Sequence, residues 1–410
     1  MRRTRNGSSP ASSSDTPSSP EALNSPGTVS SSGTVSSSGG WNGEHSDAQD
    51  SILSVRDLAV EYRTALGKVR ALNGVTFDVR RGRVLGVVGE SGSGKSVTAR
   101  AILQILERQG HLTAGSIVFH PGKGERGESL REQHPDQAAA TTESGGIDLT
   151  RLGATSDAMR AIRGADIAMI FQEPMSSLNP VYTVGAQIQE AILLHQNPDK
   201  KESWVQAVEM LRQVGMPNPE RIATSYPHEL SGGMRQRAMI AMALSCHPAL
   251  LIADEPTTAL DVTTEAQILA LMRRLKGEIG MSIMFITHSM GVVAQLCDEV
   301  IVMYQGRVVE RASVDDIFYH PKHPYTRSLL RSIPRIGAAE HTPLEVIKGS
   351  VPDPYATVPG CTFHPRCPDF IGDVCQTVIP PETLLAGGTH GVRCHLYDDE
   401  RALAGSKTEA

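Results

Sequence analysis

The sequence predicts an α/β fold, because three short apolar runs each lead directly into a glycine-rich or polar segment. The run at residues 84–88 precedes GESGSGKS, which is followed by a helix-like pattern at residues 97–106. The run at residues 250–253 ends in Asp254 and Glu255, and the run at residues 167–171 ends in Gln172. Buried strands that alternate with polar loops and helices are typical of the parallel sheets of α/β proteins.

The length and composition indicate a globular protein. The chain has 410 residues, of which 40% are hydrophobic and 20% charged, enough for one large core or two smaller ones. The net charge of −6 argues against a nucleic-acid partner. There is no apolar run of about 18 residues that could span a bilayer, and the arginines at the N-terminus are not followed by the apolar segment of a secretory signal. We therefore expect the chain in the cytosol.

The N-terminal part divides into a polar tail and two strands. Residues 1–50 are dominated by Ser, Gly, Pro and Thr, and we expect them to be disordered because they cannot bury enough apolar surface to fold. Residues 52–62 and 69–79 alternate as strands do. Tyr62 ends the first strand, about thirty residues before GESGSGKS. Its ring could stack on a nucleotide base or simply pack at a sheet edge, and the sequence does not decide between these roles.

GESGSGKS matches the phosphate-binding pattern GxxxxGKS in its proper place between a strand and a helix. Glycines allow successive N–H groups to turn toward phosphate oxygens, and the following helix adds its positive N-terminal end. Lys95 is then expected to reach the β- and γ-phosphates, and Ser96 to ligate Mg²⁺. The predicted nucleotide-binding residues here are Gly89, Glu90, Ser91, Gly92, Ser93, Gly94, Lys95 and Ser96.

Two segments in the middle of the chain differ in their expected roles. Residues 121–146 form a polar stretch inside a predicted hairpin, and we expect a surface insertion without chemistry. Residues 181–216 have apolar side chains at helical spacing and predict a small helical subdomain. LSGGMRQ then opens a helix that runs to His247 and stops at Pro248. Its first N–H groups could bind an anion at Ser231, Gly232 and Gly233, or the turn could be an ordinary helix cap.

The acidic pair and two isolated polar residues complete the predicted site. Neighbouring residues on a strand face opposite sides, so Asp254 would hold Mg²⁺ while Glu255 orients and polarises the attacking water. Gln172 could ligate the metal, although one glutamine proves little. TALD at residues 258–261 starts the next helix, and the strand in SIMFITHSM ends at His288. A histidine there could contact the γ-phosphate, but a lone histidine is more often a capping residue.

The C-terminal part contains a predicted hairpin that turns at Gln305 and Gly306, then HPYTRSLL, then a cysteine-rich segment. Four of the six cysteines lie here, at Cys361, Cys367, Cys375 and Cys394, separated by five, seven and eighteen residues. In a reducing cytosol this favours metal ligation over disulfides. The usual zinc spacing of two intervening residues is absent.

Six motifs in this order resemble those of ATP-binding cassette (ABC) proteins: GESGSGKS, Gln172, LSGGMRQ, LLIADEP, TALD and His288. The resemblance covers about residues 53–331. It implies a P-loop NTPase, RecA-like α/β core with an antiparallel β-subdomain and an inserted α-helical subdomain at about residues 180–247. It also implies catalytic roles for Gln172, Glu255 and His288, and nucleotide contacts from Ser231, Gly232, Gly233, Asp254 and Asp261.

The phrases FQEPMSSLNP, PTTALDVT, HPYTRSLL and PGCTFHPRCP resemble those of the ATPase subunits of dipeptide, oligopeptide and nickel importers. This resemblance implies an ABC domain at residues 51–315, a Cys-rich extension at residues 316–400 and a tail at residues 401–410. The expected function is ATP hydrolysis that drives peptide import, with nickel or another small solute as the alternative cargo. A soluble cassette that acts on ribosomes or DNA is disfavoured, because the chain has neither a second cassette nor a coiled-coil insertion.

The same family resemblance implies partners and cofactors. Two cassettes would pair head to tail on the cytoplasmic face of the plasma membrane, under two membrane-spanning permease subunits, while an extracytoplasmic binding protein delivers the solute. The second cassette is expected to be a related, non-identical chain. The cofactors would be ATP and Mg²⁺. The four tail cysteines match the positions of a [4Fe–4S] cluster, although Cys₄ ligation also suits zinc, and His364 or His395 could replace one thiol.

Overall fold

The computed structural model describes most of the chain between Asp50 and Asp398. The described ranges are 50–121, 140–143, 145–172, 177–196, 198–258, 260–333, 347–353, 355–356, 358–385 and 388–398. The predicted disordered segment 1–50 lies outside them except for Asp50, as do most of the insertion at 121–146 and the whole tail at 401–410.

The centre of the fold is an eight-stranded sheet in the order β11-β12-β10-β9-β3-β8-β7-β6. Its strands β6, β7, β8, β3 and β9 are parallel neighbours. Every residue of β3, β7 and β8 is buried, which explains why these strands are unbroken apolar runs in the sequence. These five strands span Ile167–Ile170, Leu250–Asp254, Ser282–Ile286, Val84–Val88 and Glu299–Tyr304, in the order β6, β7, β8, β3 and β9.

The two faces of this sheet pack against different layers, and alternate residues of β3 point to each of them. Val84 and Val88 join the core that contains the helical subdomain and α10 (Val262–Ile279). Leu85 and Val87 join the core formed with α1 (Lys95–Ile102) and a second sheet. The second sheet is antiparallel and four-stranded, in the order β2-β1-β4-β5. Its strands are Gly67–Arg80, Ser51–Thr64, Gly110–Phe119 and Ile147–Asp148.

This second sheet confirms the predicted antiparallel β-subdomain. The pairing of Val118 with Asp148 joins β4 to β5 and shows that the polar insertion lies within a hairpin, as expected. Asp148 also caps the short turn Leu149–Arg151, and α4 (Asp157–Ile162) follows with Ser156 as its cap.

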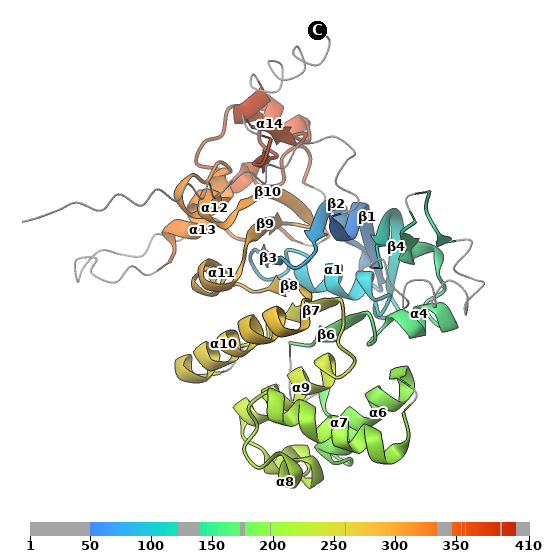
Figure 1. Ribbon diagram of the computed structural model, residues 1–410. Coiled ribbons are helices and arrows are strands. Elements are labelled where there is room, and N and C mark those ends of the chain that lie inside the picture. Colours follow the sequence, from blue (N-terminus) through green and yellow to red (C-terminus); the bar gives the residue numbers. More distant parts are fainter. Residues whose placement is uncertain are drawn as a thin grey trace, which may run out of the picture. The chain divides into compact units, whose positions relative to one another are not determined.

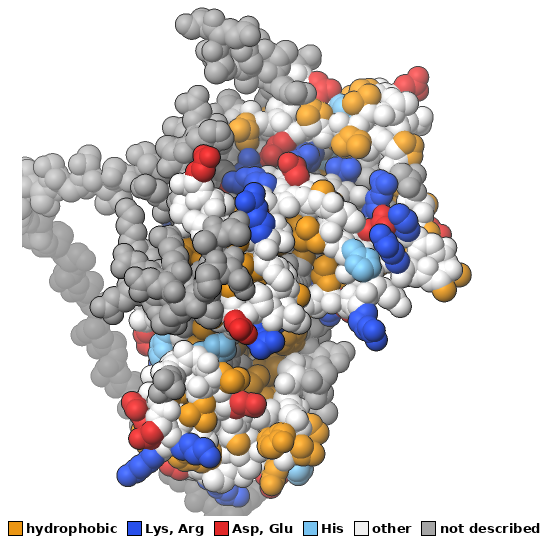
Figure 2. Space-filling model, turned by 90° about the vertical axis from the view of Figure 1, so that its right-hand side faces the viewer, with side chains coloured by type: hydrophobic (Ala, Val, Ile, Leu, Met, Phe, Trp, Pro, Cys, Tyr) orange, Lys and Arg blue, Asp and Glu red, His pale blue; other side chains and the backbone are white. Residues whose placement is uncertain are grey.

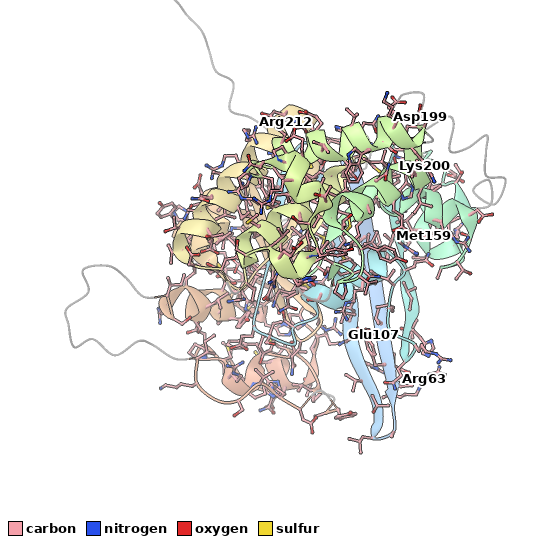
Figure 3. All side chains as sticks on the ribbon, turned by 90° about the horizontal axis from the view of Figure 1, so that it is seen from below. Arg63, Glu107, Met159, Asp199, Lys200 and Arg212 are labelled. Atoms are coloured by element: carbon pink, nitrogen blue, oxygen red, sulfur yellow. The ribbon has the colours of Figure 1, made fainter. Side chains whose placement is uncertain are left out.

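The predicted helical subdomain is present beyond β6 (Figure 1), and its described residues include four α-helices and the short 3₁₀ helix Pro227–Glu229. Asp199 caps α7 by accepting hydrogen bonds from the N–H groups of Lys201 and Glu202, and Arg212 lies in the last turn of the same helix (Figure 3). The turn at Ser231 then starts the last helix. The bounds are α6 Val184–Gln196, α7 Lys200–Gln213, α8 Pro219–Thr224 and α9 Gly232–Leu244.

Several predicted boundaries are wrong for a local backbone reason. The first helix ends at Ile102 and not at Leu106, because the chain turns at Gln104 with a φ of 51°. The helix predicted to reach His247 ends at Leu244, and His247 itself has a φ of 52°. Strand β6 ends at Ile170 and not at Phe171, whose side chain is 41% exposed.

The C-terminal region, defined here as residues 316–398, continues the central sheet. Strand β10 (Arg307–Ser313) pairs with β9 across the turn predicted at Gln305 and Gly306, and on its other side pairs with β12 (Gly391–Val392). Strand β11 (Thr383–Leu384) adds the edge. The buried Glu310 of β10 accepts hydrogen bonds from His390 Nε2 at 2.7 Å and the N–H of His323 at 3.0 Å.

Further helices connect these strands. Met290–Leu296 forms α11, Val314–Tyr319 forms α12, Pro324–Arg331 forms α13 and Asp373–Thr377 forms α14.

We expect Gly306→Ala to lower the free energy of unfolding by about 2 kcal/mol or more. Gly306 has a φ of 70°, and an added Cβ would lie 2.4 Å from the carbonyl oxygen of Ala71. In the matched control Gly277→Ala, the new methyl meets nothing within 4 Å on helix α10, so this change should raise stability by roughly 0.5–1 kcal/mol. Urea denaturation of the full chain measures both. Equal stability of the two variants would contradict the close packing at Gly306.

Candidate functional site

The phosphate loop lies between β3 and α1 and has the backbone conformations that its glycines permit. Gly92 has a φ of 78°, and Gly94, the N-cap of α1, has a φ of 102° and provides no side-chain cap. An added Cβ at Gly92 would meet nothing within 4 Å. The loop thus borders open space at Gly92, and the first N–H groups of α1 have no capping side chain, an arrangement suited to an anion such as phosphate.

Lys95 is buried within this loop. Its Nζ donates to the carbonyl oxygens of Gly89 at 2.9 Å and Glu90 at 3.1 Å. Burial lowers the pKa of Lys95, while the negative charges of Glu255 and Asp254 act to raise it. The buried Oγ of Ser93 has no hydrogen-bond partner among the described residues. The loop thus contains a cation and an unused polar atom, and both fit a phosphorylated ligand.

Ser96 and Asp254 meet at the carboxyl end of the parallel strands. The Oγ of Ser96 donates to Oδ1 of Asp254 at 3.0 Å. Burial raises the pKa of Asp254, and the hydrogen bond from Ser96 opposes this change. Hydroxyl and carboxylate oxygens are the ligands that Mg²⁺ prefers, and Mg²⁺ commonly takes one or two protein ligands and keeps several waters. The pair fits the predicted magnesium site.

Glu255 contacts the other two predicted catalytic residues, Gln172 and His288. Its carboxylate accepts a hydrogen bond from Nε2 of Gln172 at 3.1 Å, and its Oε1 lies 3.3 Å from Nδ1 of His288. The hydroxyl of Thr258 donates to it at 3.0 Å. The structure thus brings together Gln172, Glu255 and His288, which the sequence places far apart. Sequence reasoning assigned no role to Thr258, although it stands in the TALD motif.

Asp254 and Glu255 have different side-chain partners, but not for the predicted reason of alternation along a strand. Strand β7 ends at Asp254, so Glu255 does not follow the alternation of a strand. It has a φ of 47°, in the left-handed region that is strained for a residue with a side chain. Its N–H is held by the carbonyl oxygen of Ile286 on β8 at 2.9 Å. The change of backbone conformation, and not the pleat, turns the two carboxylates apart.

The Ser231 turn has different neighbours from the phosphate loop. Ser231 is exposed and caps α9, accepting a hydrogen bond from the N–H of Met234 at 3.3 Å. A Cβ added at Gly233 would lie 2.8 Å from Thr264, in the first turn of α10, where Asp261 is the N-cap. Hydrogen bonds from Thr264 lower the pKa of Asp261. Among the described residues, no hydrogen bond or ion pair joins Ser231 to the phosphate loop.

Tyr62 lies beside the phosphate loop. A cavity of about 820 Å³ is lined by Tyr62 together with Ser91 and Gly92 of the loop. The hydroxyl of Tyr62 donates to Glu107, which is labelled in Figure 3. The cavity is large enough for a nucleotide base, because pockets that bind small ligands have volumes of about 300–1,000 Å³.

The four tail cysteines are free thiols in one neighbourhood. Burial raises the pKa of Cys367 to about 11 and that of Cys394 to about 12, and the thiols of Cys361 and Cys375 add to both shifts. In the part of the chain that the structure describes, however, no three His, Cys, Asp or Glu side chains are placed to hold a metal ion. The arrangement therefore does not support the predicted [4Fe–4S] cluster.

The two histidines proposed as substitute ligands are already engaged. Both ring nitrogens of His395 have partners, at Asp398 and at the carbonyl oxygen of Val378, each at 2.9 Å. Nδ1 of His364 lies 2.9 Å from the carbonyl oxygen of Cys361.

Comparisons with known proteins agree with this geometry. Residues 72–258 match the ABC transporter family model, and residues 309–375 match the oligopeptide/dipeptide transporter C-terminal region. A relative from Brucella melitensis, named a peptide import ATP-binding protein, is 46% identical over 85% of this chain and 97% of its own. Glutathione import ATP-binding protein GsiA of Escherichia coli K12 is 50% identical over 72% of this chain, which corresponds to 44% of GsiA.

Solved structures show the same fold. The dimeric MJ0796 cassette aligns with a TM-score of 0.52 and 24% identity, covering 64% of this chain and 98% of that one. CbiO1 from Clostridium perfringens, part of the ABC transporter complex cbiONQ, aligns with a TM-score of 0.51 and 25% identity, covering 66% and 92%.

The fold and the site together define an ABC transporter ATPase, a P-loop α/β domain with a β-subdomain and a helical subdomain. More narrowly, the chain belongs to the oligopeptide/dipeptide importer family of ABC transporter ATP-binding subunits. The ABC family predicted from the ordered motifs and the importer subfamily predicted from the longer phrases are both confirmed. Among the described residues, no helix is both long and apolar enough to cross a membrane.

We expect Asp254→Asn to raise the free energy of unfolding of the nucleotide-free chain at pH 7. Asn keeps an oxygen that can accept from Ser96 and removes a buried charge whose pKa is raised by burial. A carboxyl group with a raised folded-state pKa loses stability as pH rises from about 4, the ordinary value for Asp, through the folded-state value. The advantage of the variant should therefore be smallest near pH 4 and grow with pH in urea denaturation. An advantage that shrinks as pH rises would contradict this reading.

Proposed function

We propose that this chain powers peptide import by hydrolysing ATP in a site that it shares with a second cassette. The observation that carries the proposal is the group around Glu255. One carboxylate beside the phosphate loop contacts Gln172 and His288, while in the described part of the chain the exposed Ser231 turn makes no hydrogen bond to that loop. A complete ATP site would then need the corresponding turn of another chain.

The proposed chemistry assigns a task to each polar group. Lys95 would exchange its two carbonyl partners for oxygens of the β- and γ-phosphates. The bound Mg²⁺, held by Ser96 and Asp254, would neutralise charge on the phosphates. Glu255 would orient and polarise the attacking water.

The contacts of Glu255 suit this role. Gln172 and Thr258 donate hydrogen bonds to its Oε2, and His288 lies at Oε1. Together they fix the direction of the carboxylate, so its acceptor oxygen can face a water that approaches the γ-phosphate. The contacts of Gln172 would also depend on whether Mg²⁺ is bound.

The second cassette would supply its own LSGGM-type turn to the γ-phosphate bound at the phosphate loop of this chain. Ser231, Gly232 and Gly233 of this chain would contact the second nucleotide, with Asp261 close to the contact between the two chains. Each nucleotide would bridge two subunits, so ATP binding closes the pair and hydrolysis releases it. The family resemblance favours a related, non-identical partner, bound on the cytoplasmic face of the plasma membrane to two permease subunits that receive solute from an extracytoplasmic binding protein.

The helical subdomain offers a surface for a permease. Val181, Tyr182 and Leu194 are large apolar side chains that are 57–72% exposed there. Figure 2 shows hydrophobic side chains on the exposed surface of the lower part of the molecule. Exposed apolar groups on a subdomain that follows Gln172 in the chain suit a protein partner, so motion at the γ-phosphate could pass to the permease.

Peptides are the proposed cargo because relatives are named for peptide import and for glutathione import, and glutathione is itself a tripeptide. Nickel or another small solute is the alternative within the same family.

The [4Fe–4S] cluster on Cys361, Cys367, Cys375 and Cys394 is a separate proposal that rests on the family resemblance and on four free thiols. Because these side chains are not placed around one ion, binding would require them to move closer together. Chain purified without oxygen should then absorb visible light and contain about four iron and four sulfide per chain. A colourless protein with stoichiometric zinc, or with no metal, would refute the cluster.

We expect Glu255→Gln to bind Mg·ATP within about twofold of the wild type but to hydrolyse it at least about 100-fold more slowly. Gln keeps the size and the hydrogen-bonding reach of Glu but cannot polarise water. Glu278→Gln is the matched control, since Glu278 is exposed on α10 and pairs with Arg274. Nucleotide affinity and phosphate release measure the two effects. Turnover that survives in Glu255→Gln would remove Glu255 from the catalytic role.

A further inference from the structure

Glu90, in the phosphate loop, is held through all three of its polar groups. Its carbonyl oxygen accepts from Lys95, but its other two groups are bound by the C-terminal region. The N–H of Glu90 donates to the hydroxyl of Tyr325 at 2.8 Å. Its carboxylate accepts two hydrogen bonds from Arg366, at 2.7 Å and 3.1 Å. A segment about 276 residues further along the chain thus fixes the turn that leads into the phosphate loop.

The contact with Arg366 has the features of a strong ion pair. The guanidinium meets the carboxylate through two nitrogens, which fixes orientation as well as charge. The Arg366 side chain is only 5% exposed, so solvent screens this pair weakly. The same guanidinium donates to the hydroxyl of Tyr304 at 3.3 Å, and its Nε donates to the carbonyl oxygen of Lys348 at 3.2 Å. Loss of either charge would leave the other one partly buried and unpaired.

The groups that hold Glu90 are themselves fixed by packing. Tyr304, Tyr325 and Phe363 form an aromatic cluster with ring centroids 4.7–5.3 Å apart. Tyr325 and Phe363 are fully buried, and Phe363 is three residues from Arg366. The carbonyl oxygen of Phe363 also accepts the N–H of Arg366 at 3.0 Å. Arg366 and Tyr325 therefore present their polar atoms to Glu90 from a rigid support.

The C-terminal region also borders the cavity beside Tyr62. Val351, Pro352 and Tyr355 line it together with the phosphate-loop residues Ser91 and Gly92. The hydroxyl of Tyr355 lies 3.2 Å from the Oγ1 of Thr64 at the end of β1. A nucleotide in this cavity would therefore touch both the ABC core and the C-terminal region.

We propose that Arg366 is a positioning residue of the nucleotide site, which acts through Glu90 to hold the phosphate loop in its binding conformation. The inference rests on the proposed ATP binding and adds the C-terminal region to the machinery that performs it. If the loop is already ordered, less of the binding free energy is lost in ordering it when the phosphates bind. Freeing Glu90 should therefore weaken binding and leave the hydrolytic groups around Glu255 intact.

The test compares variants of the full chain for their affinity for Mg·ATP. Arg366→Met keeps the length of the side chain and removes its charge, and we expect about tenfold weaker binding. Arg366→Lys keeps the charge but not the two-nitrogen contact and should fall between Met and the wild type. The KM for ATP should rise in the same order, while kcat at saturating ATP stays within about twofold.

The matched control is Asp369→Asn. Asp369 pairs with Arg327 of helix α13 at 3.0 Å, so this change also removes an ion pair, but one that lies within the C-terminal region and does not involve the phosphate loop. Binding by this variant should equal that of the wild type. Unliganded thermal unfolding of every variant shows whether a change in affinity merely follows a change in stability. Equal weakening by Asp369→Asn and Arg366→Met would overturn the inference.

A second variant covers the case in which Arg366→Met does not fold. Glu90→Gln breaks the same pair from the other side and should weaken binding by a similar factor. Where both fold, the double variant should bind no more weakly than the weaker-binding single variant, because one contact is lost in each case. Affinities in Arg366→Met and Glu90→Gln that match or exceed the wild type would overturn this inference alone. A wild-type chain that does not bind Mg·ATP would overturn the proposed function and this inference with it.

Discussion

The parallel pairing of β3 and β7 with β8 is the constraint on which the nucleotide site depends. Val87 and Asp254 pair in register with the same residue of β8, Ile286, so the three strands end in one row. The phosphate loop, the acidic pair and His288 each begin within two residues of that row. Because side chains alternate along a strand, a shift of one residue would turn Asp254 away from Ser96. The close packing of alternate side chains into two different cores opposes such a shift.

Much of this site could be predicted from the sequence, because its motifs are local. The strand, the glycines and the Lys-Ser pair of the phosphate loop are contiguous, and their chemistry follows from residue type. Contacts between distant segments could not be predicted in the same way. Nothing in the sequence around Glu90 indicates that Arg366 binds it. The left-handed backbone conformation of Glu255 could not be predicted from the sequence either. It is held by β8, which is a neighbour of Glu255 in space and not in sequence.

The cysteine-rich segment is a different case, because the described structure does not support the metal centre that its sequence pattern predicts. Four thiols near one another suggested a metal centre, yet their spacing was unlike the usual zinc pattern, and the folded arrangement does not bring three of them around one point. The segment does fix the position of Arg366, which lies in the turn between Cys361 and Cys367. The residues between the cysteines are therefore better connected to the nucleotide site than the cysteines themselves.

Strand β10 belongs to two parts of the molecule at once, since it pairs with β9 of the ABC core on one side and with β12 on the other. Cutting the chain after β10 would uncover a row of backbone N–H and C=O groups and would leave Glu310 without His390. Such an open strand can pair with its copy in another molecule. A shortened protein would then tend to aggregate. Its low yield or aggregation would be caused by the open strand edge and would not reveal the role of the missing segment in the intact enzyme.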